Sequence, residues 1–264
     1  MAIVETFALS RWFGGVRAVD GLSITVDACE VFGLLGPNGA GKSTTVKMLT
    51  TLLRPSAGRA TIDGYDLVRQ ASSVRRVIGY VPQLVSADGS LTGAENLRIF
   101  AKLYDIPHTE QRARIDEALE FMGLTNAAHA VVGTYSGGMI RRLEIAQSML
   151  HRPRVLFLDE PTVGLDPSAR KAVWEHLRSL REEFDTTIVM TTHQMEEADG
   201  VCSRVAILHQ GQVAVIGTPA ELKASLGAEG ATLDDVFIKY AGTSLESGGY
   251  REARRTRRTA RRLG

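Results

Sequence analysis

This sequence has few cysteines and lacks both long apolar runs and an N-terminal segment that resembles a secretory signal. The two cysteines, Cys29 and Cys202, lack metal-ligand spacing, so we expect reduced thiols in a cytosolic protein and neither a disulfide nor a metal site between them. No apolar run approaches the roughly 18–20 residues that span a bilayer. The first residues also lack the basic and apolar regions of a secretory signal. These absences predict a chain that is not itself a membrane-spanning protein.

Size and charge predict one globular unit followed by a strongly basic tail. A length of 264 residues allows one large domain or a core with a smaller lobe, and 44% apolar residues suit an ordinary globular core. The net charge is only +1, yet residues 251–262 hold seven arginines against one acid. We expect residues 241–264 to form a disordered, Gly/Ser/Arg-rich tail. A solvated end is its default interpretation; contact with anionic lipid or with nucleic acid is the alternative.

The strongest motif is a match to the phosphate-binding pattern of glycine, any four residues and Gly-Lys-Ser, made by Gly36, Pro37, Asn38, Gly39, Ala40, Gly41, Lys42, Ser43 and Thr44. Its glycines let the backbone fold round a triphosphate with N–H groups pointing inward. The Lys42 ammonium suits the β- and γ-phosphates, and the Ser43 hydroxyl is a hard ligand for Mg²⁺. A predicted strand at 31–35 and helix at 43–53 place the loop at a helix N-terminus, which favours phosphate. The sequence therefore predicts binding of a nucleoside triphosphate with Mg²⁺.

Alternating strands and helices elsewhere predict an α/β fold with a parallel sheet and right-handed crossovers. Two antiparallel strands are expected within residues 3–28, with Trp12 to Gly15 in the turn between them. Residues 90–128 carry apolar positions at three- and four-residue spacing, which predicts a helical insert. The other expected strands and helices are strands at 60–62, 77–82, 155–160, 187–191 and 205–208, and helices at 140–150, 168–182 and within 218–240.

Two acids end the apolar strand at 155–160 and form the second strong signal. Ligands of open α/β sheets bind beyond the carboxyl ends of the strands. A carboxylate at Asp159 suits Mg²⁺, usually through water, and the next one, Glu160, suits polarising the water that attacks the γ-phosphate. An ordinary acidic strand end is the simpler alternative.

Other candidates carry weaker local signals. Ser136, Gly137 and Gly138 precede a predicted helix, so they fit either a second anion cradle or a plain helix N-cap. Gln83 and His193 each follow a predicted strand, where a structural role is the default and a contact to water, metal or γ-phosphate is the alternative. Asp166 resembles a turn or cap residue, and an aromatic ahead of the phosphate loop either caps the core edge or stacks on an adenine.

Taken in order, these motifs resemble those of the ATP-binding cassette (ABC) ATPases over residues 3 to 240. The phosphate loop resembles Walker A and the strand that ends at Glu160 resembles Walker B. Residues 135–139 stand at the family signature Leu-Ser-Gly-Gly-Gln, with Tyr and Met replacing its first and last residues. The remaining matches are the Q-loop glutamine, the D-loop, the switch histidine and the adenine-stacking aromatic, at Gln83, Asp166, His193 and Phe13.

The resemblance implies a P-loop NTPase (RecA-like) core with a small antiparallel β subdomain and an inserted α-helical subdomain. Residues 1–240 would be the nucleotide-binding domain and residues 88–150 the insert. Two cassettes would pack head to tail, each closing its signature over ATP on the other's Walker A loop. The implied catalytic residues are Glu160 as general base, His193 sensing the γ-phosphate, and Gln83; Ser43, Gln83 and Asp159 would serve Mg²⁺.

Within the family, the chain is most similar to ATP-binding subunits of ABC-2 type exporters of the daunorubicin-resistance group, on residues 18–22, 30–36, 139–144 and 232–237. That similarity implies export of a drug-like or lipid-like substrate through a separate membrane permease, with this chain at the cytoplasmic membrane face. The competing expectation is a soluble ABC ATPase acting on nucleic acid or ribosomes, which the short helical insert disfavours. Cys29 stands where a turn glycine is usual, so we expect it to cost modest stability.

Overall fold

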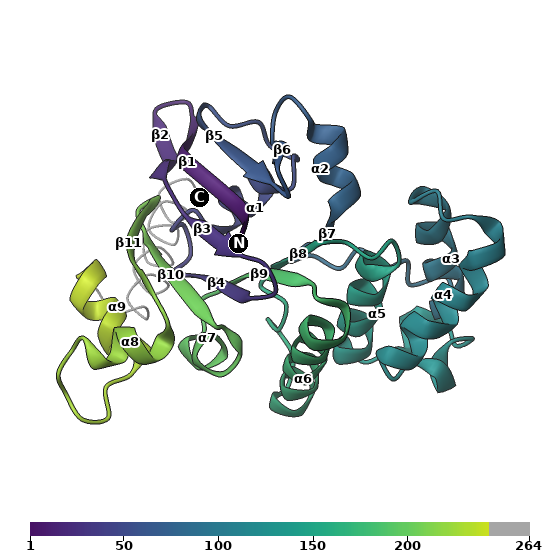
Figure 1. Cartoon of the computed structure of the whole chain (residues 1–264). Helices are drawn as coiled ribbons and strands as arrows, with labels where there is room; N and C mark the ends of the chain where they lie inside the picture. Colours follow the sequence, from purple (N-terminus) through teal and green to yellow (C-terminus); the bar gives the residue numbers. More distant parts are fainter. Residues whose placement is uncertain (243–264) are drawn as a thin grey trace, which may run out of the picture.

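The computed structural model describes residues 1–242, and the arginine-rich tail with its predicted disorder and partners lies outside the described residues. Two sheets form the body of the molecule (Figure 1). The larger has six strands in the order β11-β10-β4-β9-β8-β7, and the smaller has β2-β1-β5-β6 with β3 paired to β1. The predicted α/β architecture with a parallel sheet and a small antiparallel sheet is therefore confirmed.

The six-stranded sheet carries the strands that lead to the predicted site. Its parallel members are β4 (Val31–Leu35), β7 (Ile78–Val81), β8 (Val155–Asp159), β9 (Thr187–Thr192) and β10 (Arg204–His209). Every residue of β4, β8 and β9 is buried, as expected for a parallel sheet covered on both faces. The antiparallel edge strand β11 (Gln212–Gly217) was not predicted, because its residues alternate weakly in polarity.

The smaller sheet corrects one prediction. It consists of β1 (Ala2–Phe13), β2 (Val16–Leu22), β3 (Thr25–Asp27), β5 (Ala57–Ile62) and β6 (Tyr65–Asp66). Trp12 and Phe13 do not lie in the turn but end β1, paired with Arg17 and Val16 of β2. The turn needs only Gly14 and Gly15, because Gly14 adopts a φ of 57° that tightens the reversal.

Nine α-helices surround the sheets in the described part of the chain: α1 (Lys42–Leu49), α2 (Ala71–Val77), α3 (Gly93–Leu103), α4 (His108–Phe121), α5 (Gly137–Met149), α6 (Pro167–Phe184), α7 (Met195–Val201), α8 (Pro219–Ala224) and α9 (Leu233–Ala241). Two short 3₁₀ turns, Thr125–Ala127 and Val132–Thr134, precede α5. The helical insert is confirmed as α3 and α4. Helix α1 ends earlier than expected, before Thr51 at a φ of 63°, and the short α2 and α7 carried no clear periodic signal.

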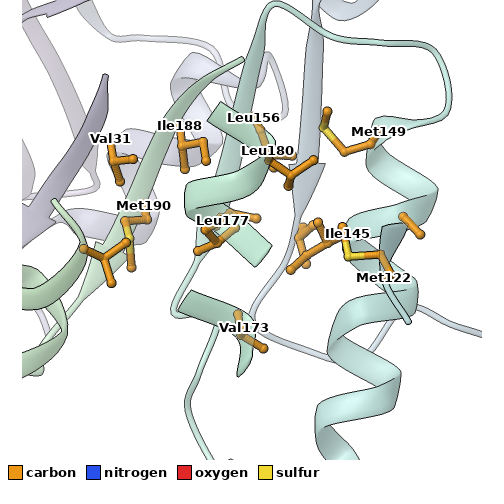
Figure 2. Packing of buried hydrophobic residues seen from close by; sticks show 14 of the residues in the cluster. Val31, Met122, Ile145, Met149, Leu156, Val173, Leu177, Leu180, Ile188 and Met190 are labelled. Carbon is orange, nitrogen blue, oxygen red and sulfur yellow. The ribbon is translucent and has the colours of Figure 1, made fainter. Parts of the chain in front are cut away.

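Two apolar clusters lie on opposite faces of the six-stranded sheet. One joins the smaller sheet and α1 to residues such as Phe32 and Phe157. The other covers the face that packs against α5 and α6 and continues into α3 and α4 (Figure 2). There Leu177 and Leu180 of α6 are fully buried, and each contributes about 1.5–3 kcal/mol. The helical insert therefore shares one core with the sheet that carries the site.

Replacing Cys29 by glycine should stabilise the protein. Cys29 adopts a φ of 60° in the turn before β4, a conformation that costs a non-glycine residue about 1–2 kcal/mol. We expect Cys29→Gly to raise the free energy of unfolding by about 1 kcal/mol in denaturant titrations, with unchanged ATP hydrolysis. The matched control is Ala28→Gly in the same turn, where φ is not positive and glycine should be destabilising. Equal effects of the two substitutions would contradict the strain argument.

Candidate nucleotide site

The loop between β4 and α1 leaves a helix N-terminus open for an anion. Gly41 is the N-cap of α1 at a φ of 103°, and no side chain of the described residues caps this helix. A Cβ on Gly41 would lie 2.6 Å from the Ala18 carbonyl oxygen, so only glycine fits there. Gly39 also has a positive φ, 83°. The backbone N–H groups that begin α1 are thus available to phosphate oxygens.

Lys42 lies buried inside this loop and ends at the acidic edge of the sheet. Its Nζ donates hydrogen bonds to the carbonyl oxygens of Gly36 at 2.7 Å and Pro37 at 3.1 Å. Nζ is also 3.5 Å from Glu160 Oε1. Burial lowers the pKa of Lys42 below its usual value, and the charges of Glu160 and Asp159 oppose that shift. Without nucleotide, the carbonyl and carboxylate oxygens around Lys42 stabilise its buried charge. The phosphates of a bound triphosphate would be stronger partners for the same charge.

Asp159 ends β8 and faces the hydroxyl predicted to bind Mg²⁺. The Ser43 hydroxyl donates to Asp159 Oδ1 at 2.9 Å, and the Thr191 hydroxyl of β9 donates to the same oxygen at 2.6 Å. The described residues contain no cluster of three or more His, Cys, Asp or Glu side chains fit to hold a metal. One carboxylate beside one hydroxyl fits Mg²⁺, which usually takes few protein ligands and completes its shell with water and phosphate oxygens.

The Glu160 carboxylate is the group that most side chains of the site contact. It has a φ of 49°, and its backbone N–H donates to the Thr191 hydroxyl at 2.9 Å. Gln83 Nε2 donates to Glu160 Oε2 at 3.2 Å, and His193 Nδ1 lies 3.2 Å from Glu160 Oε1. An uncommon backbone conformation held by this many contacts is typical of a functional position. The structure thus brings Gln83, Lys42 and His193 together on one carboxylate.

Thr191 is the residue of this site that sequence reasoning missed. Its hydroxyl contacts both Asp159 Oδ1 and the Glu160 N–H, so it fixes both acids. A threonine inside an apolar strand gives no local signal, because β-branched residues are ordinary in strands. Only the pairing of β9 beside β8, which places Asp159 opposite Thr191, reveals it.

The signature and D-loop residues are not part of this cluster in one chain. Ser136 accepts a hydrogen bond from the Met139 N–H, and Asp166 accepts one from the Ala169 N–H, so each is the N-cap of its helix, α5 or α6. A Cβ on Gly138 would lie 2.8 Å from Ala169 Cβ, which explains glycine there by packing. The cap interpretation is therefore observed, and a contact with nucleotide stays a prediction.

Phe13 is the last residue of β1. Its side chain is 48% exposed, and the Arg11 guanidinium lies 4.8 Å from its ring centroid. An exposed aromatic ring suits stacking on a base, and the arginine holds the ring by a cation–π contact. Its role towards adenine stays a prediction.

No helix in residues 1–242 has the length and apolarity needed to cross a membrane. The family model for "ABC transporter" matches residues 19–163. The chain is 46% identical over 225 residues to the daunorubicin/doxorubicin resistance ATP-binding protein DrrA of Streptomyces peucetius, covering 85% of this chain and 68% of that protein. It is 47% identical over 222 residues to the Nod factor export ATP-binding protein I of Burkholderia thailandensis, covering 84% and 73%.

A solved structure of the ATP-binding subunit of an ABC transporter matches with a TM-score of 0.79 and 30% identity, covering 90% of this chain and 99% of that one. Fold, motif order and sequence identity agree, and the predicted P-loop core with its inserted helices is that of these proteins. The chain belongs to the ABC transporter family, as one of its ATP-binding, ATP-hydrolysing subunits.

Proposed function

We propose that this protein hydrolyses ATP to drive export of a drug-like or lipid-like substrate through a separate membrane permease, from the cytoplasmic face of the membrane. The observation that carries the proposal is Glu160, which Gln83, Lys42 and His193 contact at the end of β8. The names of the relatives support export, since one refers to resistance and the other to Nod factor export. The drug-like substrate class follows the name of the first relative, which refers to daunorubicin and doxorubicin.

Glu160 is the proposed general base. It lies at the carboxyl end of the sheet beside the phosphate loop, where a water attacking the γ-phosphate would be in reach. Gln83 and His193 orient its carboxylate from both oxygens, and His193 would donate an N–H to the γ-phosphate. Residues 36–44 would cradle the phosphates through backbone N–H groups and Lys42, and Phe13 would stack on the adenine.

Ser43 and Asp159 are the proposed Mg²⁺ ligands. Gln83, whose side chain reaches Glu160, would contact the same ion through water. When bound, Mg²⁺ neutralises charge that develops on the transferred phosphoryl group. The Asp159 carboxylate is already positioned by hydroxyls of two different elements, so it requires little rearrangement to take this role.

A second copy of the chain would complete the site. Ser136, Gly137, Gly138 and Asp166 lie at the N-termini of α5 and α6. A helix N-terminus attracts anions, so these residues suit the γ-phosphate bound by a partner cassette. This proposal makes the ATP-bound form a head-to-tail dimer with two shared sites.

The permease contact is proposed for the apolar surface that follows Gln83. Leu84 and Val85 are exposed directly after it, and Ile99 and Leu103 are exposed one turn apart on α3. Exposed large apolar side chains are typical of a protein-binding surface. Leu84 and Val85 directly follow Gln83, whose side chain reaches Glu160, so a permease bound to them would respond to events at Glu160.

A mild-detergent affinity pull-down from native membranes tests the transport function. We expect recovery of a multi-spanning membrane protein in equal ratio with this chain, and a reduced yield with Leu103→Asp. The control is Val16→Asp, because Val16 is equally exposed apolar surface but belongs to the smaller sheet. Recovery of ribosomal proteins or nucleic acid without any membrane protein would overturn the exporter assignment and leave only the ATPase.

A further inference from the structure

A buried polar seam joins α5 to the chain around Gln83. The residues that form it are 6% exposed or less although all are polar: Arg141, Glu144, Gln147 and Ser148. They recur at three- and four-residue spacing and so share one face of the helix. The Ser148 hydroxyl donates to the Tyr80 carbonyl oxygen of β7 at 3.1 Å, and Gln147 Nε2 donates to Asn96 Oδ1 of α3 at 3.3 Å. Figure 1 shows α5 between the β7 edge of the sheet and α3.

Arg141 holds the backbone of the loop that carries Gln83. Its Nη1 donates to the Pro82 carbonyl oxygen at 2.9 Å, and its Nη2 donates to the Gln83 carbonyl oxygen at 3.2 Å. The guanidinium fork therefore grips two successive peptide groups at once, which a single-point donor cannot do. The side chain of Gln83 extends the other way and reaches Glu160.

Glu144 completes the grip one turn further along α5. Its Oε2 lies 3.1 Å from Arg141 Nη1, and its Oε1 accepts from the Ser86 hydroxyl at 2.9 Å and from the Ser86 backbone N–H. The two charged side chains are 7% and 1% exposed. Burying such a pair is costly, and well-packed apolar residues often give equal or better stability. A pair placed here therefore points to a positional role.

We propose that Arg141 and Glu144 fasten the Gln83 loop to α5, so that the loop and the signature residues at the start of α5 move as one body. The side chain of Gln83 then follows any change at Glu160. Its backbone, bound to Arg141, transmits that displacement to α5. Arg141 lies only three residues beyond Gly138, so little flexible chain separates the grip from the signature. Both are positioning residues: they connect Gln83, at the Glu160 of their own chain, to Ser136, which would face the partner cassette's ATP.

The proposal rests on the proposed dimeric function. It predicts different effects on ATP binding by the monomer and on ATP-driven dimerisation. ATP binding to a single chain would depend mainly on the 36–44 loop and Phe13, and Gln83 would reach Mg²⁺ only through water. Closure of the dimer requires α5 to follow Gln83. Loss of the contacts that Arg141 and Glu144 make with the Gln83 loop should therefore leave the ATP affinity of the monomer unchanged. It should weaken only ATP-driven dimerisation.

The test uses the full chain carrying Glu160→Gln, which should retain ATP and whose new amide oxygen still accepts from Gln83. Into it we introduce Arg141→Met with Glu144→Leu, which leaves no unpaired buried charge. Monomer affinity is measured with a fluorescent ATP analogue and dimerisation by sedimentation against ATP concentration. We expect unchanged affinity and an about tenfold higher ATP concentration for half-dimerisation, the effect of losing two ordinary hydrogen bonds.

Arg141→Lys is the milder variant, since it keeps the charge beside Glu144 but cannot bridge both carbonyl groups. It should fold and shift dimerisation in the same direction by a smaller factor. The matched control is Arg114→Met on α4, because Arg114 also pairs with a carboxylate, Glu110, and donates to a carbonyl of the α5 region, Leu150, yet lies away from Gln83. It should change neither readout.

Dimerisation at the parent's ATP concentration in a folded Arg141→Lys or double variant would overturn the proposal. An equal shift with Arg114→Met would overturn it too, by showing general loosening of the helical insert. Failure of the Glu160→Gln parent to dimerise at any ATP concentration would instead refute the proposed dimeric function, so the two failures are distinguishable.

Discussion

Glu160→Gln should bind ATP and hydrolyse it about 10²–10⁴ times more slowly than the wild-type chain. The substitution keeps the size of the side chain and an oxygen that accepts from Gln83, whose Nε2 is 3.2 Å from Glu160 Oε2. It removes the carboxylate that would take a proton from the attacking water. Because ATP then persists, the variant should accumulate as an ATP-bound dimer. Steady-state phosphate release, equilibrium ATP binding and sedimentation with ATP measure these three results.

The control for Glu160→Gln is Glu197→Gln on α7. Glu197 is also a buried glutamate, and its Oε1 accepts from the Thr162 hydroxyl at 2.7 Å and the Trp174 indole N–H at 2.9 Å. Glutamine retains an acceptor for both, so the fold and the turnover should stay close to wild type. Wild-type turnover in Glu160→Gln would remove Glu160 from the role of general base. Loss of ATP binding there would place it in ground-state binding instead.

The phosphate loop and the acidic strand end were predictable because their signals are local. Loop, lysine and flanking strand and helix are contiguous in sequence, and the carboxyl ends of parallel strands meet at one edge, so Asp159 had to face Ser43. Thr191 and the Arg141–Glu144 pair were not predictable in the same way. Their roles depend on which strand pairs with β8 and which loop packs on α5, and neither follows from local composition.

One misplaced feature and one open interpretation have local physical causes. Trp12 and Phe13 were expected in a turn, but β1 continues through them because a glycine pair suffices for the reversal. The signature residues carried two interpretations in the sequence, helix cap or anion cradle, and within one chain the hydrogen bonds of Ser136 show the cap. The cradle requires a second copy, so single-chain geometry leaves that interpretation as a proposal.

Lys42→Met should abolish the stabilisation that ATP gives to the wild-type chain. The Lys42 ammonium is the charge inside the phosphate loop, and each charge-assisted hydrogen bond it would make to a phosphate is worth about 1.5–3 kcal/mol. Losing two of them lowers affinity by about 10²–10⁴-fold. In thermal denaturation with Mg²⁺ and ATP at a hundred times the wild-type dissociation constant, the wild-type chain should gain about 2.7 kcal/mol, and Lys42→Met should gain almost nothing.

Without nucleotide, the same substitution should cost little stability, and the reason lies in the pKa of Lys42. Burial lowers this pKa, so the charged form is less favourable in the folded chain than in the unfolded one. Wherever the amine is protonated in both states, its charge therefore opposes folding, and methionine removes that cost while keeping the apolar stem. Lys47→Met, on the exposed face of the same helix, is the control and should retain the full ATP effect. An ATP-dependent gain in Lys42→Met equal to wild type would contradict the phosphate role, whereas a large loss without nucleotide would make Lys42 a residue of the fold.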